Sequence, residues 1–134
     1  EEPVGVAVPE TSKLAKTANV TARDLADWPL VCWGACHATE VLLEKMAKDG
    51  LQPQTLHRVS SSADLALVAD ALGAYPLGPV STRLPGRTMK LVTDAPLKHR
   101  VNLVAVAGRP YSKAAGVLIR LVRALDWSRL TKTV

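Results

Sequence analysis

The chain has 134 residues, a length that predicts one domain or one domain with an appendage. Hydrophobic residues make up 48% of it and charged residues 22%, and because phenylalanine is absent the core must be aliphatic. No apolar run approaches the roughly 20 residues of a membrane span. The acidic opening EEPVGVAVPE lacks the features of a signal peptide. We therefore expect a cytoplasmic protein without membrane contact, whose two cysteines stay reduced.

The net charge of +5 is unevenly distributed along the chain. Residues 1–82 hold six Lys or Arg against ten Asp or Glu, and residues 83–134 hold eleven against two. A basic half often indicates nucleic-acid binding. Here the basic residues alternate with apolar ones, and no basic cluster stands beside aromatic residues. We expect a solvated basic face, not a nucleic-acid surface.

The first third of the chain predicts a strand over residues 3–9 and a short helix over residues 21–27. Thr21 caps that helix, and Asp24 occupies the acidic position of a capping box. A short buried strand over residues 29–33 follows. An amphipathic helix is predicted over residues 38–48 and ends at Gly50, because glycine readily adopts the left-handed backbone that ends helices.

Residues 54–79 predict a strand, a serine-rich turn, a helix and a second strand. Ser60, Ser61 and Ser62 precede the apolar residues 63–72, and a serine oxygen can accept a free N–H of the first helical turn. Gly73 then ends the helix. Because this helix is almost wholly apolar, we expect it to be covered on several sides.

The remaining part of the chain predicts a weak strand over residues 88–92, a polar turn over residues 94–100, and a clear strand over residues 101–107. A helix over residues 112–125 begins at Ser112 and carries an apolar stripe of Leu118, Leu121, Val122 and Leu125. Strands that alternate with helices in this way predict an α/β fold with a Rossmann-like, mixed and mainly parallel sheet.

In such a fold, ligands bind where strands end and helices begin, which makes the serine turn a candidate binding site. Ser60, Ser61 and Ser62 offer hydroxyls next to helix N–H groups, a combination that suits an anion. The alternative is plain helix capping, but a cap needs only one serine.

A second candidate turn, which contains Trp33, Gly34 and Cys36, follows the strand at residues 29–33. Gly34 allows close backbone approach, and Trp33 can stack on an aromatic ligand. We expect Cys32 to be a core residue and Cys36 to be semi-buried behind it. The alternative is that the two thiols form a redox pair. Metal binding by these cysteines and His37 is a further alternative, but the spacing does not match a zinc site.

Catalysis is not expected from this sequence. His57 and His99 are isolated, and nothing places a nucleophile, a base and an orienting group at a recognisable spacing. Because dinucleotide and phosphate-loop motifs are also missing, we expect no enzyme, no cofactor and no metal.

Three stretches resemble the sensor domain of LysR-type transcriptional regulators. VSSSADLALVADALG resembles a recurring serine turn, apolar helix and glycine pattern. VAVPETSKLAKTANVTARDLADWPLV resembles a "V-P, H-P-L-A, V-T-L-x-D-L-A-D-x-P-L-V" segment, although Ser12 and Lys13 replace the usual His-Pro. Residues 113–125 resemble the C-terminal helix of that family.

The resemblance implies one lobe of a two-lobe fold like that of type 2 periplasmic solute-binding proteins. Residues 1–107 correspond to the second lobe, and residues 108–134 to a helix that returns to an absent first lobe. It also implies a small-molecule effector in the interlobe cleft, dimers or tetramers of the parent protein, and DNA binding only through a helix-turn-helix domain with no counterpart here. The alternatives are a lobe of a solute-binding transport protein and a redox-sensing regulator that uses Cys32 and Cys36.

Overall fold

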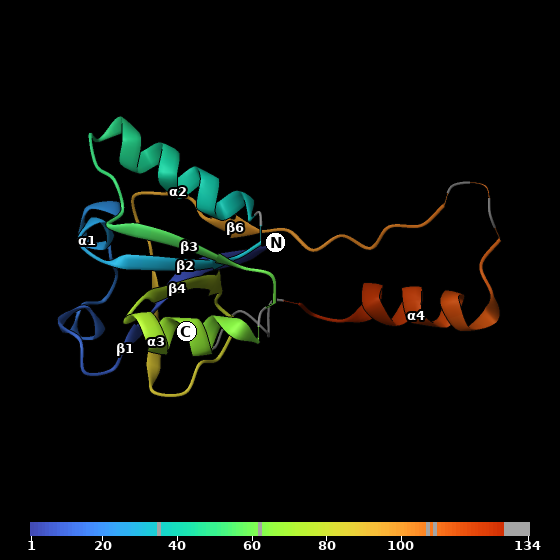
Figure 1. Cartoon of the computed structure of the whole chain (residues 1–134). Coiled ribbons are helices and arrows are strands. Elements are labelled where there is room, and N and C mark those ends of the chain that lie inside the picture. The colour runs from blue at the N-terminus through green and yellow to red at the C-terminus, as the bar shows by residue number, and fades with distance from the viewer. Residues whose placement is uncertain (35, 62, 107, 109, 128–134) are drawn as a thin grey trace.

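The computed structural model of the chain describes residues 1–34, 36–61, 63–106, 108 and 110–127. In chain order the elements are β1 (Glu2–Pro9), the 3-10 helix η1 (Lys13–Lys16), α1 (Ala22–Ala26), β2 (Pro29–Trp33), α2 (His37–Lys48), β3 (Thr55–Val59), α3 (Asp64–Leu72), β4 (Tyr75–Pro79), β5 (Arg87–Leu91), β6 (Lys98–His99) and α4 (Lys113–Ala124). The strand order is β3-β2-β4-β1-β5, and β6 pairs with β1 (Figure 1). The predicted α/β fold with a mixed sheet is confirmed, but the sheet is not mainly parallel, because β1 pairs antiparallel with β4, β5 and β6.

Two kinds of pairing divide this sheet. β2 runs parallel to β3 and β4, and Trp33 at its end is the register partner of Val59 at the end of β3. β1 runs antiparallel to β4, β5 and β6. Because β3, β2 and β4 point the same way, their carboxyl ends meet at one edge of the sheet.

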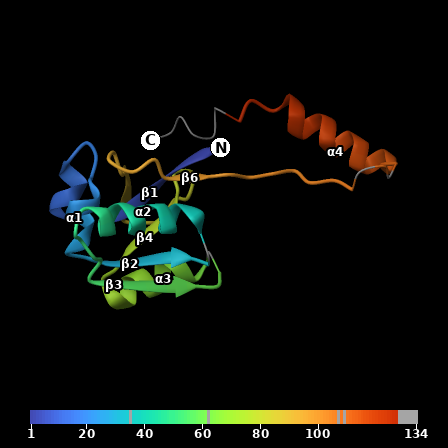
Figure 2. The ribbon, with the colours of Figure 1, turned by 90° about the horizontal axis from the view of Figure 1, so that it is seen from above.

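The two faces of the sheet carry different helices (Figure 2). α1 and α2 lie on one face, where Val4, Val6 and Val8 of β1 join a buried cluster with Leu42 and Met46. α3 lies on the other face. Side chains alternate between the faces of a strand, so the residues between these valines point toward the α3 side. A smaller buried cluster under α3 consists of Val31, Leu65, Ala69 and Ala74.

Local capping signals agree with the observed helix ends. The predicted box at α1 is present: the Asp24 carboxylate accepts the Thr21 N–H at 2.8 Å, and Thr21 Oγ1 accepts the Asp24 N–H at 3.4 Å. α3 ends at Gly73, whose φ of +60° is left-handed, and Gly50 after α2 has a φ of +69°.

The expectation that α3 is covered on several sides was wrong. Leu65 and Ala69 are buried, but Leu67 is 71% exposed and Leu72 is 46% exposed. A helix that packs on a sheet turns only one stripe toward it, and no element in the described part of the chain covers the outer side.

The predicted strand over residues 101–107 was also wrong for residues 101–106, and residue 107 lies outside the described residues. Residues 101–106 pair with no described strand, and Val101 and Val104 are 75% and 84% exposed. High strand propensity is not enough to form a strand, because the segment also needs a neighbouring strand to pair with its backbone N–H and C=O groups. The turn predicted over residues 94–100 instead contains β6.

α4 stands away from the sheet (Figure 1). Its predicted cap is present, since Ser112 Oγ accepts the Ala115 N–H at 3.2 Å. The stripe residues Leu118, Leu121 and Leu125 are between 56% and 58% exposed. In the part of the chain that the structure describes, no helix is long and apolar enough to cross a membrane.

Candidate functional site

The two turns that the sequence singled out lie side by side at the carboxyl edge of the parallel strands. One follows Trp33 of β2, and the other follows Val59 of β3, its register partner. The Gly34 N–H donates to the Val59 carbonyl at 2.8 Å. Gly34 has a φ of +58°, a backbone conformation that favours glycine, so this residue lets the chain turn toward α2 while it stays bonded to β3.

Trp33 bridges the two turns. Its indole Nε1–H donates to the Ser60 carbonyl at 3.1 Å, and the side chain remains 46% exposed. A tryptophan held by its polar end keeps an aromatic surface open for stacking. The structure therefore places Trp33, Gly34 and Ser60 in one cluster.

Ser61 has a local capping role. Its Oγ accepts the Ala63 N–H at 3.1 Å, and its carbonyl accepts the Asp64 N–H at 3.2 Å. The residue at the N-cap position of α3 is Ala63, one residue after the predicted serines, and it offers no side-chain cap. A hydroxyl that accepts one bond still has its own proton to donate. Ser62 lies outside the described residues.

Arg58 is a site residue that the sequence reasoning missed. Its guanidinium donates to the Gly34 carbonyl at 3.2 Å and to Glu40 Oε1 at 2.8 Å, which ties the Gly34 turn to α2. The hydrogen bond to Glu40 is the main cause of the raised pKa of Arg58, and the Cys32 sulfur also contributes. The available signal was its position two residues before the serine turn.

Cys36 stands at the start of α2, where its side chain makes no capping hydrogen bond. It is half-buried, whereas Cys32 is fully buried, and both are free thiols. This agrees with the interpretation of Cys32 as a core residue. Among the described residues, no group of three His, Cys, Asp or Glu side chains could hold a metal ion.

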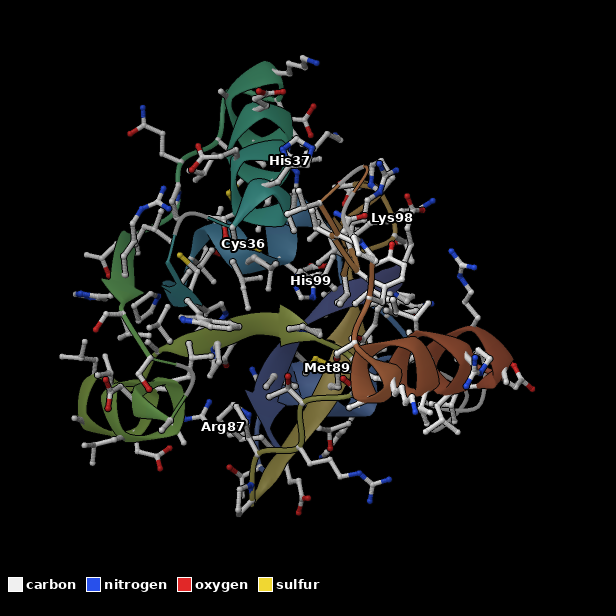
Figure 3. The ribbon with its side chains drawn as sticks, turned by 90° about the vertical axis from the view of Figure 1, so that its right-hand side faces the viewer. Cys36, His37, Arg87, Met89, Lys98 and His99 are labelled. Atoms are coloured by element: carbon white, nitrogen blue, oxygen red, sulfur yellow. The ribbon has the colours of Figure 1, made fainter. Side chains whose placement is uncertain are left out.

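Two more polar groups near this edge were not predicted. Thr39 Oγ1 and His99 Nδ1 are buried and have no hydrogen-bond partner within the described structure. Thr39 is in the first turn of α2, and His99 is on β6, which contacts α2. Figure 3 shows His99 at this edge, close to Cys36 and His37. No local motif marks His99, because only the pairing of β6 with β1 brings it here.

Comparisons with known proteins agree with this architecture. HinK, a LysR family transcriptional regulator from Pseudomonas aeruginosa, shares 18% identity over 99% of this chain and 47% of its own, with a TM-score of 0.59. The BenM effector-binding domain with its effector benzoate shares 24% identity over 68% of this chain and 45% of its own, with a TM-score of 0.54. The effector-binding domain of QuiR in complex with shikimate shares 12% identity over 89% of this chain and 58% of its own, with a TM-score of 0.59.

At these identities the likeness concerns the fold, which is the type 2 periplasmic-binding-like fold of LysR substrate-binding domains. The chain spans about half the length of these solved structures. A comparison with curated proteins found no match. The model of the LysR substrate binding domain family matches residues 1–126, nearly the whole chain. The chain therefore belongs to the LysR substrate binding domain family.

Proposed function

We propose that this chain is part of the effector-binding regulatory domain of a LysR-type transcriptional regulator, and that the turns after β2 and β3 contact a small organic anion. The observation that carries the proposal is the juxtaposition of these turns, joined by the hydrogen bond from Trp33 to Ser60. Hydroxyls and helix N–H groups suit a carboxylate, and the exposed indole suits a ring. Benzoate and shikimate, bound by two related domains, combine a ring with a carboxylate.

The effector would act by differential binding. Residues 1–107 form the second lobe, and residues 108–134 return the chain to a first lobe that completes the cleft. An effector that prefers one interlobe arrangement shifts the protein toward that arrangement. DNA binding belongs to a helix-turn-helix domain outside this chain, and the parent protein acts in the cytoplasm as a regulator, not as an enzyme.

The proposed site is tested by a titration with benzoate, followed by amide chemical shifts. Because only one lobe contributes contacts, we expect millimolar binding, which corresponds to about −4 kcal/mol. The amides of Gly34, Cys36, Ser60 and Ser61 should shift together and saturate. Benzamide, which has the same ring but no charge, is the matched control and should produce much smaller shifts. Saturable shifts confined to other residues, or equal effects of benzamide, would refute the proposed anion site.

We also propose that the parent assembles as a dimer or tetramer and that the isolated chain self-associates. α4 carries an exposed apolar stripe of Leu118, Leu121 and Leu125. Contact with water is unfavourable for such a surface, which favours its burial against a second molecule. Light scattering should give a mass above 14.3 kDa that grows with concentration. Replacement of Leu118 and Leu121 by Glu should reduce it. A monodisperse monomer at high concentration would contradict this expectation.

A further inference from the structure

The turn between β2 and α2 is fastened to the end of β3 by contacts that continue beyond the paired strands. Trp33 and Val59 are register partners, and the Gly34 N–H donates to the Val59 carbonyl at 2.8 Å. The Trp33 indole donates to the Ser60 carbonyl at 3.1 Å. Arg58 Nη1 donates to the Gly34 carbonyl at 3.2 Å. Both the N–H and the carbonyl of Gly34 are thus bound by residues at the end of β3.

This turn depends on such contacts to keep one shape. Gly34 has a φ of +58°, and a Cβ at this position would meet no described atom within 4 Å, so glycine is present for its left-handed backbone and not for lack of space. Cys36, at the N-cap position of α2, makes no side-chain capping bond. Cys32 Sγ lies 3.9 Å from the Gly34 oxygen, but a thiol is a weak donor. The Arg58 guanidinium is therefore the strong side-chain donor on this carbonyl.

Glu40 of α2 holds the same guanidinium through its second terminal nitrogen. Arg58 Nη2 donates to Glu40 Oε1 at 2.8 Å, and both residues are exposed. Glu40 lies in the first turn of α2, where a negative charge suits the positive end of the helix dipole. Because a guanidinium presents its N–H groups in a rigid fork, this one group joins β3, the Gly34 turn and the start of α2. Figure 1 shows α2 beginning at the edge where β2 and β3 end.

The contribution of this exposed ion pair lies in geometry more than in stability. Exposed ion pairs add little to the free energy of unfolding. This pair nevertheless selects one arrangement of a turn whose glycine permits several. Trp33 and Ser61 belong to different turns, so a ligand that touches both needs them at one fixed separation. A separation that is set before the ligand arrives lowers the entropic cost of binding.

We propose that Arg58 is a positioning residue of the effector site, which holds the Trp33–Gly34 turn against the serine turn so that one ring-bearing anion contacts both. Arg58 acts through the Gly34 carbonyl and is not the group that receives the anion, because its terminal nitrogens are engaged by Gly34 and Glu40. Glu40 acts through Arg58. This role rests on the effector site proposed above, so it is tested both with the ligand and without it.

The test with the ligand compares benzoate titrations of the 134-residue parent, Arg58→Gln, Arg58→Lys and Glu40→Ala. Glu40→Ala separates position from charge: removal of a carboxylate near a bound anion strengthens binding if only charge matters, whereas removal of the anchor of Arg58 weakens it. We expect Arg58→Gln and Glu40→Ala to bind benzoate about threefold to tenfold more weakly, the effect of one exposed hydrogen bond. Arg58→Lys keeps the charge but not the fork, so it should also bind more weakly. Lys45→Gln, which breaks the ion pair with Asp49 at the other end of α2, is the matched control and should bind benzoate as the parent does.

The test without the ligand is amide hydrogen exchange of the free chain. The Gly34 N–H should exchange about threefold to tenfold faster in Arg58→Gln and in Glu40→Ala than in the parent. The Val31 N–H, inside β2, should keep the protection that it has in the parent. Far-ultraviolet circular dichroism checks that each variant folds.

The proposal is overturned if Glu40→Ala binds benzoate as tightly as the parent or more tightly, if Arg58→Lys keeps the affinity of the parent, or if exchange at Gly34 is unchanged in both variants. Weaker binding in all three variants, with faster exchange at Gly34, supports it. If the parent binds no benzoate but exchange at Gly34 is faster in both variants, the proposed ligand is wrong, whereas the role of Arg58 in positioning the turn is supported.

Discussion

Leu42→Ala should lower the free energy of unfolding by about 2–5 kcal/mol, because it leaves a cavity in the main core. Leu42 on α2 is completely buried and packs with the valines of β1. Loss of this amount removes a large share of the roughly 5–15 kcal/mol that stabilises a typical domain. The variant should therefore be partly unfolded near physiological temperature.

The same substitution at Leu67 is the matched control. Leu67 on α3 is 71% exposed, so Leu67→Ala should change the free energy of unfolding by no more than about 0.5 kcal/mol. Urea denaturation of both variants measures the difference. Equal destabilisation would show that the outer side of α3 is packed in solution, as the apolar composition of this helix first indicated.

The helices and most strands were predictable because their signals are local. Thr21 with Asp24 marks the start of α1, and Gly73 marks the end of α3, through bonds and backbone angles that involve only neighbouring residues. Periodicity identified α2 as an amphipathic helix for the same reason. Burial of α3 was not predictable, because composition does not reveal how many layers cover a helix.

The remaining errors concern partners that are distant in sequence. Residues 101–106 have the composition of a strand, but strand pairing depends on a neighbour that composition cannot identify. β6 forms from a polar segment because the beginning of β1 lies next to it. By contrast, the βαβ pattern alone was enough to place the two candidate turns at one edge of the sheet. The contact of Arg58 with the Gly34 turn and the contact of β6, which carries His99, with α2 form only in the folded chain.

Two substitutions at Ser61 distinguish a role in helix capping from a role in anion recognition. Ser61→Ala removes one neutral hydrogen bond to a bound anion, worth about 0.5–1.5 kcal/mol, so benzoate affinity should fall by up to about tenfold. Ser61→Asp places a carboxylate where the Ser61 oxygen accepts the Ala63 N–H. A negative charge there suits the N-terminus of α3, so the fold should persist.

That same charge should repel a bound carboxylate. Two unit charges about 4 Å apart interact by about 4 kcal/mol near a protein surface, before screening by salt. Benzoate affinity should therefore fall by at least about a hundredfold in Ser61→Asp, well beyond the loss in Ser61→Ala. A circular dichroism spectrum identical to that of the parent would confirm that the loss is not caused by unfolding.

The dissociation constant of benzoate for the parent chain and for Ser61→Asp is the most direct measurement of effector binding at this edge. We expect saturable binding to the parent and its near-complete loss in the folded aspartate variant. If folded Ser61→Asp binds benzoate as well as the parent does, the serine turn is only a helix cap and the anion binds elsewhere.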